Sequence, residues 1–335
     1  TRFSQPDDSR GFLIKERYIL EVKALGYSTA LKRSGSMDHN SLWYRIKTNK
    51  AAYFFIAPWF ILFLAFTVYP VVFSGYLGFT SYNPLKPSTI NDFVGFQNYR
   101  NLFSDRDFLV SLRNTLVFTF GTIPFTTVFA LLLALALNKG VKFKTLFRVG
   151  FFLPTVTSLA VISTLFVLLC NQYGLISQIV QFFGGKPTNW LNNQHTALLS
   201  IMGMSVWAAT GYYMLLYLST LQSIPQELYE AATVDGANGI QKFFNVTLPH
   251  LRHITLYIII LNTINSLQVF TEPQIMTGGG PGYATTTVVL YLYRRAFSSQ
   301  MMGYASAVGY TLFILILIFA LIQLKVLGFD RRIDE

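Results

Sequence analysis

The sequence predicts an all-α protein, namely a polytopic membrane helix bundle with six transmembrane helices. Three observations support this fold class. Only 12% of the 335 residues are charged, about half the share found in a soluble domain. Uncharged runs long enough to cross a bilayer recur along the chain. The basic residues are concentrated in the first 50 positions and in alternate connecting segments, as expected of segments held on the cytoplasmic side.

Six apolar segments are candidates for membrane-spanning helices. About 30 Å of hydrocarbon requires roughly 20 apolar residues, because each helical residue advances about 1.5 Å. Hydropathy and turn signals place the six helices at 52–79, 112–137, 149–170, 197–220, 254–275 and 305–327. The run 273–293 is also uncharged, but it contains three consecutive glycines followed by Pro281. We therefore expect a loop there and not a span.

The basic residues orient the bundle. With both termini in the cytoplasm, the inner segments contain 19 of the 26 Lys and Arg residues and the outer loops contain 7. This bias follows the positive-inside rule, so the net charge of +11 indicates topology and not binding to nucleic acid. The predicted domains are a basic cytoplasmic tail at 1–50, a transmembrane domain at 51–328 with an inner loop at 221–253, and a cytoplasmic C-terminus at 329–335. Residues 11–25 of the tail are expected to form an amphipathic helix, either resting on the membrane interface or serving as a regulatory or docking element.

Several classes of function lack the residues that they require. The single cysteine, Cys170, cannot form an internal disulfide or a cysteine-rich metal site. No His-x-x-x-His, Cys-x-x-Cys or P-loop spacing occurs in the sequence, so we expect no metal site, no catalytic residue and no nucleotide site in this chain. The sequence therefore predicts a membrane protein that is not itself an enzyme.

The inner loop between the fourth and fifth predicted spans is too long and too patterned for a plain connector. Residues 223–226 fit a capping box, and residues 227–234 are mostly good helix formers. Gly236 would end that helix, because glycine tolerates left-handed backbone angles. A second short helix is expected at 240–245, and Pro249 would end it before the fifth span.

A known pattern runs through this loop: Glu230-Ala231-Ala232, then Gly236, then Leu248-Pro249. It resembles the EAA loop of binding-protein-dependent ABC importer permeases, although Val246 stands where that family often has isoleucine. Further segments resemble the maltose-type sugar permeases, at 93–99, 148–154, 276–281 and 304–307. The resemblance covers roughly residues 45–328, and the whole is most similar to the alginate-importer branch.

The resemblance implies a transmembrane permease subunit that moves an oligosaccharide from periplasm to cytoplasm, with an alginate-type uronate as one candidate. The implied partners are a second homologous permease subunit, two ATPase subunits, a periplasmic solute-binding protein and membrane lipid. ATP and Mg would be held by the ATPase subunits, and this chain would hold no cofactor. The implied location is the bacterial inner membrane.

The resemblance also implies roles for the loop residues. Glu230 would lie at the ATPase contact and pair with a basic residue there. Ala231 and Ala232 would pack into a groove of the ATPase, and Gly236 would make the turn. The same ATPase-coupling surface includes Asp235, Leu248 and Pro249. The alternative is a helix hairpin that merely caps the bundle.

Polar residues inside a membrane span usually face the bundle interior or a water-filled path. Four residues of the fifth predicted span fall within an arc of about 120°, namely Asn262, Asn265, Gln268 and Glu272. Amide groups suit sugar hydroxyls, because they both donate and accept hydrogen bonds. In the fourth span, Trp207 and Tyr213 could stack on sugar rings. The alternatives are hydrogen bonding between helices for the amides and a lipid-facing or core position for the rings.

Two arginines lie close together near the C-terminal end of the predicted transmembrane domain. Arg294 and Arg295 lie in the last predicted outer segment, where they could steer an acidic substrate or meet acids on the binding protein.

A stand-alone secondary transporter or channel for a polar solute is the alternative function. It has no ion-coupling candidate within a span except Glu272, and it does not explain the inner loop. A membrane enzyme has neither an acid–base pair nor a metal cluster to support it.

Overall fold

The computed structural model describes residues 50–139 and 142–326 of the chain. Within these ranges the protein forms helices, turns and two isolated β-bridges, and no strand. The described part is therefore all-helical, as predicted. The expected amphipathic helix at 11–25 and the C-terminal segment 329–335 lie outside the described residues. Contacts divide the chain into two units, 1–71 and 72–335.

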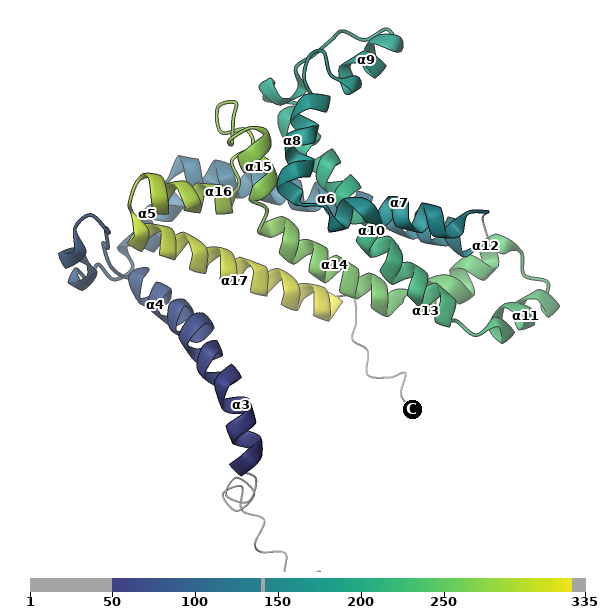
Figure 1. The fold of residues 1–335 in the computed structure, drawn as a ribbon, viewed down its shortest axis with the longest axis horizontal. Helices are drawn as coiled ribbons and strands as arrows, with labels where there is room; N and C mark the ends of the chain where they lie inside the picture. Colours follow the sequence, from purple (N-terminus) through teal and green to yellow (C-terminus); the bar gives the residue numbers. More distant parts are fainter. Residues whose placement is uncertain (1–49, 140–141, 327–335) are drawn as a thin grey trace, which may run out of the picture. The chain divides into compact units, whose positions relative to one another are not determined.

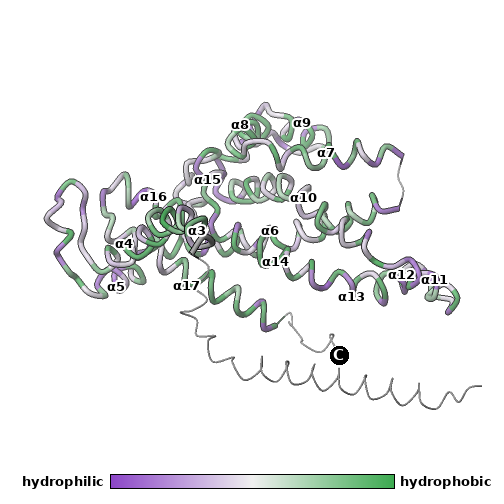
Figure 2. The backbone as a smooth tube through the Cα atoms, turned by 60° about the horizontal axis from the view of Figure 1, so that its bottom comes forward, coloured by the Kyte–Doolittle hydropathy of each residue, from purple (hydrophilic) through white to green (hydrophobic). Residues whose placement is uncertain are grey.

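The described part of the first unit is a continuous apolar helical segment (Figure 1). It consists of α3 (Lys50–Phe63), a π-helical turn (Leu64–Val68) and the beginning of α4 (Tyr69–Leu77). The stretch Tyr53–Leu77 has a mean hydropathy of 2.1, and green marks the hydrophobic residues along α3 in Figure 2. None of the side chains at 53–71 is buried. An apolar helix without a buried face suits a lipid environment, which agrees with the first predicted span.

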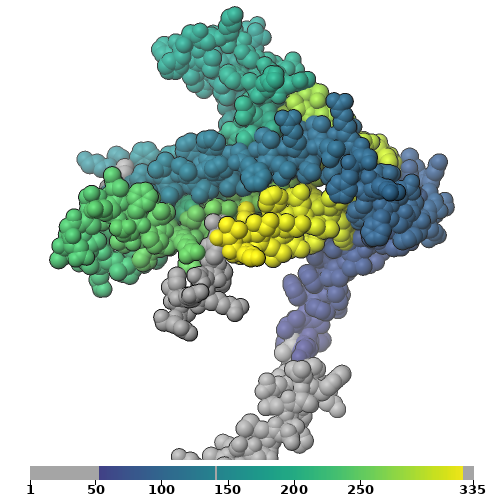
Figure 3. Space-filling view, turned by 180° about the vertical axis from the view of Figure 1, so that it is seen from behind, coloured from purple at the N-terminus to yellow at the C-terminus, as the bar shows by residue number. Residues whose placement is uncertain are grey.

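Four helices carry most of the packing in the second unit. They are α6 (Arg106–Asn138), α10 (Ala197–Ser223), α14 (Arg252–Leu267) and α17 (Met302–Val326). Helix α6 packs along α10 and α14, and α17 packs against α14. On the face shown in Figure 3, α17 lies along α6, and the rings of Phe120 and Phe319 are 5.7 Å apart.

One core cluster joins α6, α10 and α14. Ala130 and Ala134 of α6 are fully buried in the same cluster as Tyr217 and Leu218 of α10. Small side chains let helix backbones approach each other closely. The Tyr217 hydroxyl donates a hydrogen bond to Thr255 Oγ1 at 3.1 Å, which satisfies the polar group inside an otherwise apolar cluster.

The third predicted span is interrupted. Within the described residues, four helical stretches are long and apolar enough to cross a membrane: Tyr53–Leu77, α6, α10 and α17. Helices α7 (Lys144–Val156) and α8 (Leu159–Leu169) form a fifth candidate only as a pair bent by 99°. The prediction of one helix at 149–170 is therefore wrong. Thr157 has a ψ of 144° and Ser158 a ψ of 126°, and these extended residues end α7 just after Pro154.

The fifth predicted span, 254–275, is interrupted as well. Helix α14 ends at Leu267 and has 16 residues, fewer than the roughly 20 that a crossing helix needs. Helix α15 (Thr271–Met276) follows after three residues. The carbonyl oxygen of Val269 accepts a hydrogen bond from Thr287 Oγ1 at 2.8 Å, so a residue outside the predicted span stabilises the break. The described residues thus show four to five candidate spans, which does not confirm the six predicted.

Short helices and turns connect the long helices. They are α5 (Gln97–Ser104), α9 (Leu175–Phe182), α16 (Val288–Tyr293), two 3₁₀ turns (Pro87–Asn91 and Trp190–Asn192) and a π-helical turn (Arg294–Ser298). The loop expected at 273–293 is irregular only at 277–287, between α15 and α16. Buried threonines hold this shorter loop together, since Thr285 and Thr286 donate to the carbonyl oxygens of Gly280 and Gly279 at 2.8 and 2.9 Å.

A polar cluster joins the start of α6 to the segment before α17. Asp105 caps α6 by accepting hydrogen bonds from two backbone N–H groups of its first turn. The same carboxylate accepts hydrogen bonds from the hydroxyls of Tyr291 at 2.6 Å and Tyr304 at 3.1 Å, and pairs with Arg295 at 3.2 Å. Burial by itself would raise the pKa of Asp105, but the hydrogen bonds from Tyr291 and its other donors hold that pKa below its usual value.

Candidate functional site

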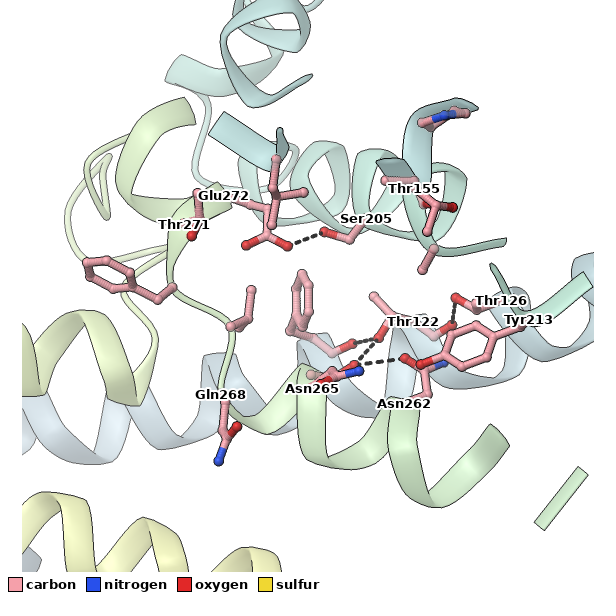
Figure 4. A pocket seen from close by; sticks show the side chains of 18 of the residues that line it. Thr122, Thr126, Thr155, Ser205, Tyr213, Asn262, Asn265, Gln268, Thr271 and Glu272 are labelled. Carbon is pink, nitrogen blue, oxygen red and sulfur yellow. Dashed lines mark hydrogen bonds between the residues drawn. The ribbon is translucent and has the colours of Figure 1, made fainter. Parts of the chain in front are cut away.

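Both helix breaks meet at one polar cavity. Residues at the break between α7 and α8 and at the break between α14 and α15 line a cavity of about 460 Å³, and α6 and α10 supply the rest of its wall (Figure 4). At membrane depth, non-helical backbone occurs where it is buried in protein or lines a water-filled cavity. The position of both helix breaks beside a cavity agrees with this rule.

An incompletely satisfied amide lies on the α14 side of the cavity. Asn262 is 5% exposed, and its Oδ1 accepts a hydrogen bond from the Ser266 hydroxyl at 3.3 Å. Ser266 is in turn 3.2 Å from the Thr122 hydroxyl of α6. The Asn262 Nδ2 has no hydrogen-bond partner among the described residues. An unpaired buried donor is costly, so this group favours an acceptor oxygen within the cavity.

A carboxylate lies on the opposite side. Glu272 of α15 is 9% exposed, and its Oε1 accepts a hydrogen bond from Ser205 Oγ of α10 at 3.3 Å. Figure 4 shows this pair across the cavity from the amides of α14. No lysine, arginine or histidine is among the described residues that line the cavity. Glu272 is thus the one charged side chain in that lining.

The structure brings together five of the six residues predicted for a substrate pathway. Asn262, Asn265, Gln268, Glu272 and Tyr213 all line the cavity. Tyr213 forms a side-chain hydrogen bond with Asn265. Gln268 lies in the break after α14, and its amide points away from Glu272 (Figure 4). The predicted arc on one continuous helix is therefore wrong, although its residues still reach the same cavity.

Trp207 lies apart from these residues. It is 51% exposed, and its ring centre is 5.5 Å from that of Phe166. It lines a second, mainly apolar cavity of about 590 Å³ between α6, α7 and α10. The structure does not place it beside the amides of α14.

Sequence reasoning overlooked the hydroxyl groups of the cavity. Thr122 and Thr126 of α6, Ser205 of α10 and Ser266 of α14 line it alongside the predicted residues. A signal for the threonines is present in the sequence, because Thr115, Thr119, Thr122 and Thr126 recur at intervals of four, three and four residues. Such spacing puts them on one face of a helix.

The inner loop forms a compact set of short helices (Figure 1). These are α11 (Gln226–Val234), α12 (Gly239–Lys242), a π-helical turn (Phe243–Thr247) and α13 (Leu248–His250). The predicted first helix and its glycine stop are confirmed, since Gly236 has a φ of 76°. The capping box is at Asn238 and Gln241 and not at 223–226. The helical run also passes through Pro249 and ends at His250, one residue later.

Internal hydrogen bonds hold the loop helices together. The hydroxyls of Tyr229 in α11 and Thr247 in the π-helical turn are 2.9 Å apart, and Lys242 donates to Thr233 at 2.8 Å. Glu230 is exposed and accepts a hydrogen bond from Gln226 at 2.9 Å. The other predicted coupling residues are exposed except for Ala232, which is half-buried: Ala231, Asp235, Gly236, Leu248 and Pro249. The predicted coupling residues thus lie on or beside one set of linked short helices.

These features define a multi-pass helical membrane protein with an open cavity, lined by polar side chains, between interrupted helices. Residues 116–334 match the family described as binding-protein-dependent transport system inner membrane component. The chain belongs to this family, and it is a sugar ABC transporter permease. Its relatives are permease subunits of ABC transporters, which carry no ATPase site of their own.

Relatives and solved structures agree with this assignment. The chain is 37% identical over 304 residues to the arabinooligosaccharides transport system permease protein AraP of Bacillus subtilis (strain 168), covering 90% of this chain and 94% of AraP. Its fold is similar to a chain in the crystal structure of a bacterial ABC transporter involved in the import of the acidic polysaccharide alginate, with a TM-score of 0.75, 23% identity, and coverage of 88% of this chain and 99% of that one. A bacterial alginate ABC transporter in complex with an alginate pentasaccharide-bound periplasmic protein gives a TM-score of 0.73 at 22% identity, covering 84% and 95% of the two chains.

Proposed function

We propose that this permease passes an oligosaccharide from the periplasm to the cytoplasm, driven by ATP hydrolysis in two separate ATPase subunits. The convergence of both helix breaks on one polar cavity carries the proposal. The hydroxyl and amide groups of that cavity can exchange hydrogen bonds with sugar hydroxyls. A second, homologous permease subunit would complete the membrane part, and a periplasmic solute-binding protein would deliver the sugar.

The proposed topology has six crossings of the bacterial inner membrane, with both termini in the cytoplasm. The bent pair α7–α8 and the interrupted pair α14–α15 each count as one crossing in this arrangement. The concentration of 19 of the 26 basic residues in the inner segments supports the orientation. The loop helices α11–α13 then face the cytoplasm.

These loop helices are the proposed docking site for an ATPase subunit, which would hold ATP and Mg. Val234 and Ile240 expose 87% and 72% of their surface, and exposed apolar groups of this kind favour a protein partner. Glu230 would meet a basic group of the ATPase, and Ala231 and Ala232 would pack into its groove. Because the loop connects α10 to α14, movement of the docked helices would reach two walls of the cavity.

The chemical class of the sugar is open to two candidates. AraP is named for arabinooligosaccharides, and the structural neighbours transport the acidic polysaccharide alginate. The chain is less than 25% identical to the alginate transporter. This similarity therefore concerns the fold and does not by itself identify the substrate. The composition of the cavity bears on this choice more directly.

Co-purification tests the proposed class of transporter. A tagged permease expressed with its neighbouring subunits is expected to retain an ATPase subunit. ATP hydrolysis by that complex should rise when the binding protein and its sugar are added together, and not with either alone. A permease that never retains an ATPase would contradict the proposal and favour a stand-alone secondary transporter or channel.

A further inference from the structure

We propose that the cavity admits uncharged, hydroxyl-rich oligosaccharides and excludes oligosaccharides that carry carboxylate groups. This inference rests on the proposed function, because it assigns the substrate class of the same cavity. It departs from the uronate candidate that the resemblance to alginate importers suggested.

The charge of the cavity is the first support. A uronate moved out of water needs compensating cations, most effectively a bidentate arginine. The described residues around the cavity supply none, and the charged group that they do supply is the carboxyl of Glu272. If Glu272 is ionised it repels a second carboxylate, and if it is protonated the cavity still lacks a positive charge. Both states disfavour an acidic sugar.

The hydrogen-bond pattern of the cavity is the second support. Asn262 Nδ2 is a buried donor without a partner among the described residues, whereas Glu272 offers acceptor positions beyond its single side-chain contact with Ser205. A sugar hydroxyl can accept from the first group and donate to the second. A carboxylate can only accept. Hydroxyl groups can therefore form hydrogen bonds with both Asn262 and Glu272, whereas a carboxylate can form one with Asn262 only.

The two outer arginines do not supply the missing cations. Arg295 pairs with Asp105 at 3.2 Å and with Asp107 at 3.6 Å. Arg294 donates a hydrogen bond to the carbonyl oxygen of Gly278. The charge of Arg295 is thus compensated within the protein, and neither arginine is among the residues that line the cavity.

Sugar binding by the assembled importer in nanodiscs, without the binding protein, tests the inference. The probes are two matched pairs that differ only in oxidation at C6: β-1,4-mannotriose against trimannuronate, and galactotriose against trigalacturonate. We expect the neutral member of a pair to bind about 10- to 100-fold more tightly, as a nearby like charge at intermediate dielectric predicts. Glu272→Arg should shift this ratio toward the uronate by at least about tenfold.

The possible outcomes separate the two proposals. Tighter binding of the uronates by the unmodified importer would overturn the inference, and so would an unchanged ratio in an assembled Glu272→Arg importer. If that variant fails to assemble, as judged by loss of the ATPase subunits, the ratio measured with the unmodified importer decides alone. Binding of no probe, together with no ATP-driven uptake of any sugar, would instead contradict the proposed function.

Discussion

The carboxylate of Asp105 and the guanidinium group of Arg295 lie 3.2 Å apart, although 190 positions separate the two residues in the sequence. Tyr291 and Tyr304 donate hydrogen bonds to the same carboxylate. The cluster fastens the first turn of α6 to the π-helical turn that precedes α17. It therefore holds together two segments that lie far apart in the sequence.

Removal of the Arg295 side chain should destabilise this connection. Arg295→Ala leaves a half-buried carboxylate without its cation, which is expected to cost about 1–3 kcal/mol. The apparent unfolding temperature of the purified permease in detergent measures the effect. Arg106→Ala is the matched control, because Arg106 is exposed at the start of the same helix and no ion pair joins it to another described residue. Equal unfolding temperatures for the two variants would contradict the role of the cluster.

The same cluster predicts a dependence of stability on pH. The pKa of Asp105 is lowered in the folded protein, so the ionised carboxylate stabilises the folded state. This contribution is fully present above the unfolded-state pKa of about 3.9 and is lost as the pH falls through the lower folded-state pKa. The difference in unfolding temperature between the unmodified protein and Asp105→Asn should therefore shrink below about pH 4. A difference that stays constant or grows in acid would contradict this sign.

Close packing of α10 on α7 depends on Gly211. A Cβ atom at this position would overlap the carbonyl oxygen of Phe151, and the backbone of α7 would have to move. We expect Gly211→Ala to lower stability by about 1–3 kcal/mol, measured as thermal unfolding in detergent. Gly203→Ala on the same helix is the control, because nothing lies within 4 Å of a Cβ built there. A loss of stability in the control alone would contradict the packing described.

Gly236 should be essential for coupling and not for membrane insertion. Its φ of 76° disfavours a β-branched residue by about 1–3 kcal/mol. The equilibrium between this turn and other conformations would therefore shift against the turn by a factor of roughly 5 to 150. Gly236→Val is expected to insert normally but to lose sugar-stimulated ATP hydrolysis and retention of the ATPase. Asparagine adopts left-handed angles more readily, so Gly236→Asn should retain most of the activity. Normal coupling in Gly236→Val would show that the turn is not needed for docking.

Features set by neighbouring residues were predictable from the sequence. The helix at 226–234 and the turn after it depend on local helix formers and on Gly236, and the structure has both. The break in the fifth predicted span depends on a distant contact. The Val269 carbonyl is held by Thr287, 18 positions away. Hydropathy alone therefore treats both interrupted pairs as single spans.

The candidate site was predicted for a partly wrong reason. A continuous helix would align Asn262, Asn265 and Gln268 on one face, but α14 ends at Leu267. Glu272 reaches the cavity because α15 starts in a new direction after the break. Ser205 of α10 donates a hydrogen bond to its carboxyl group there. The polar character of the segment pointed to the correct region, whereas the geometry of the cavity required the folded chain.

Transport by the reconstituted complex tests the central claim most directly. Proteoliposomes would contain the permease, its partner permease and the ATPase subunits, with ATP enclosed and with the binding protein and radiolabelled sugar outside. The proposed function predicts uptake that requires ATP, the ATPase subunits and the binding protein together. Equal uptake by proteoliposomes that contain this chain alone, without ATP, would contradict it.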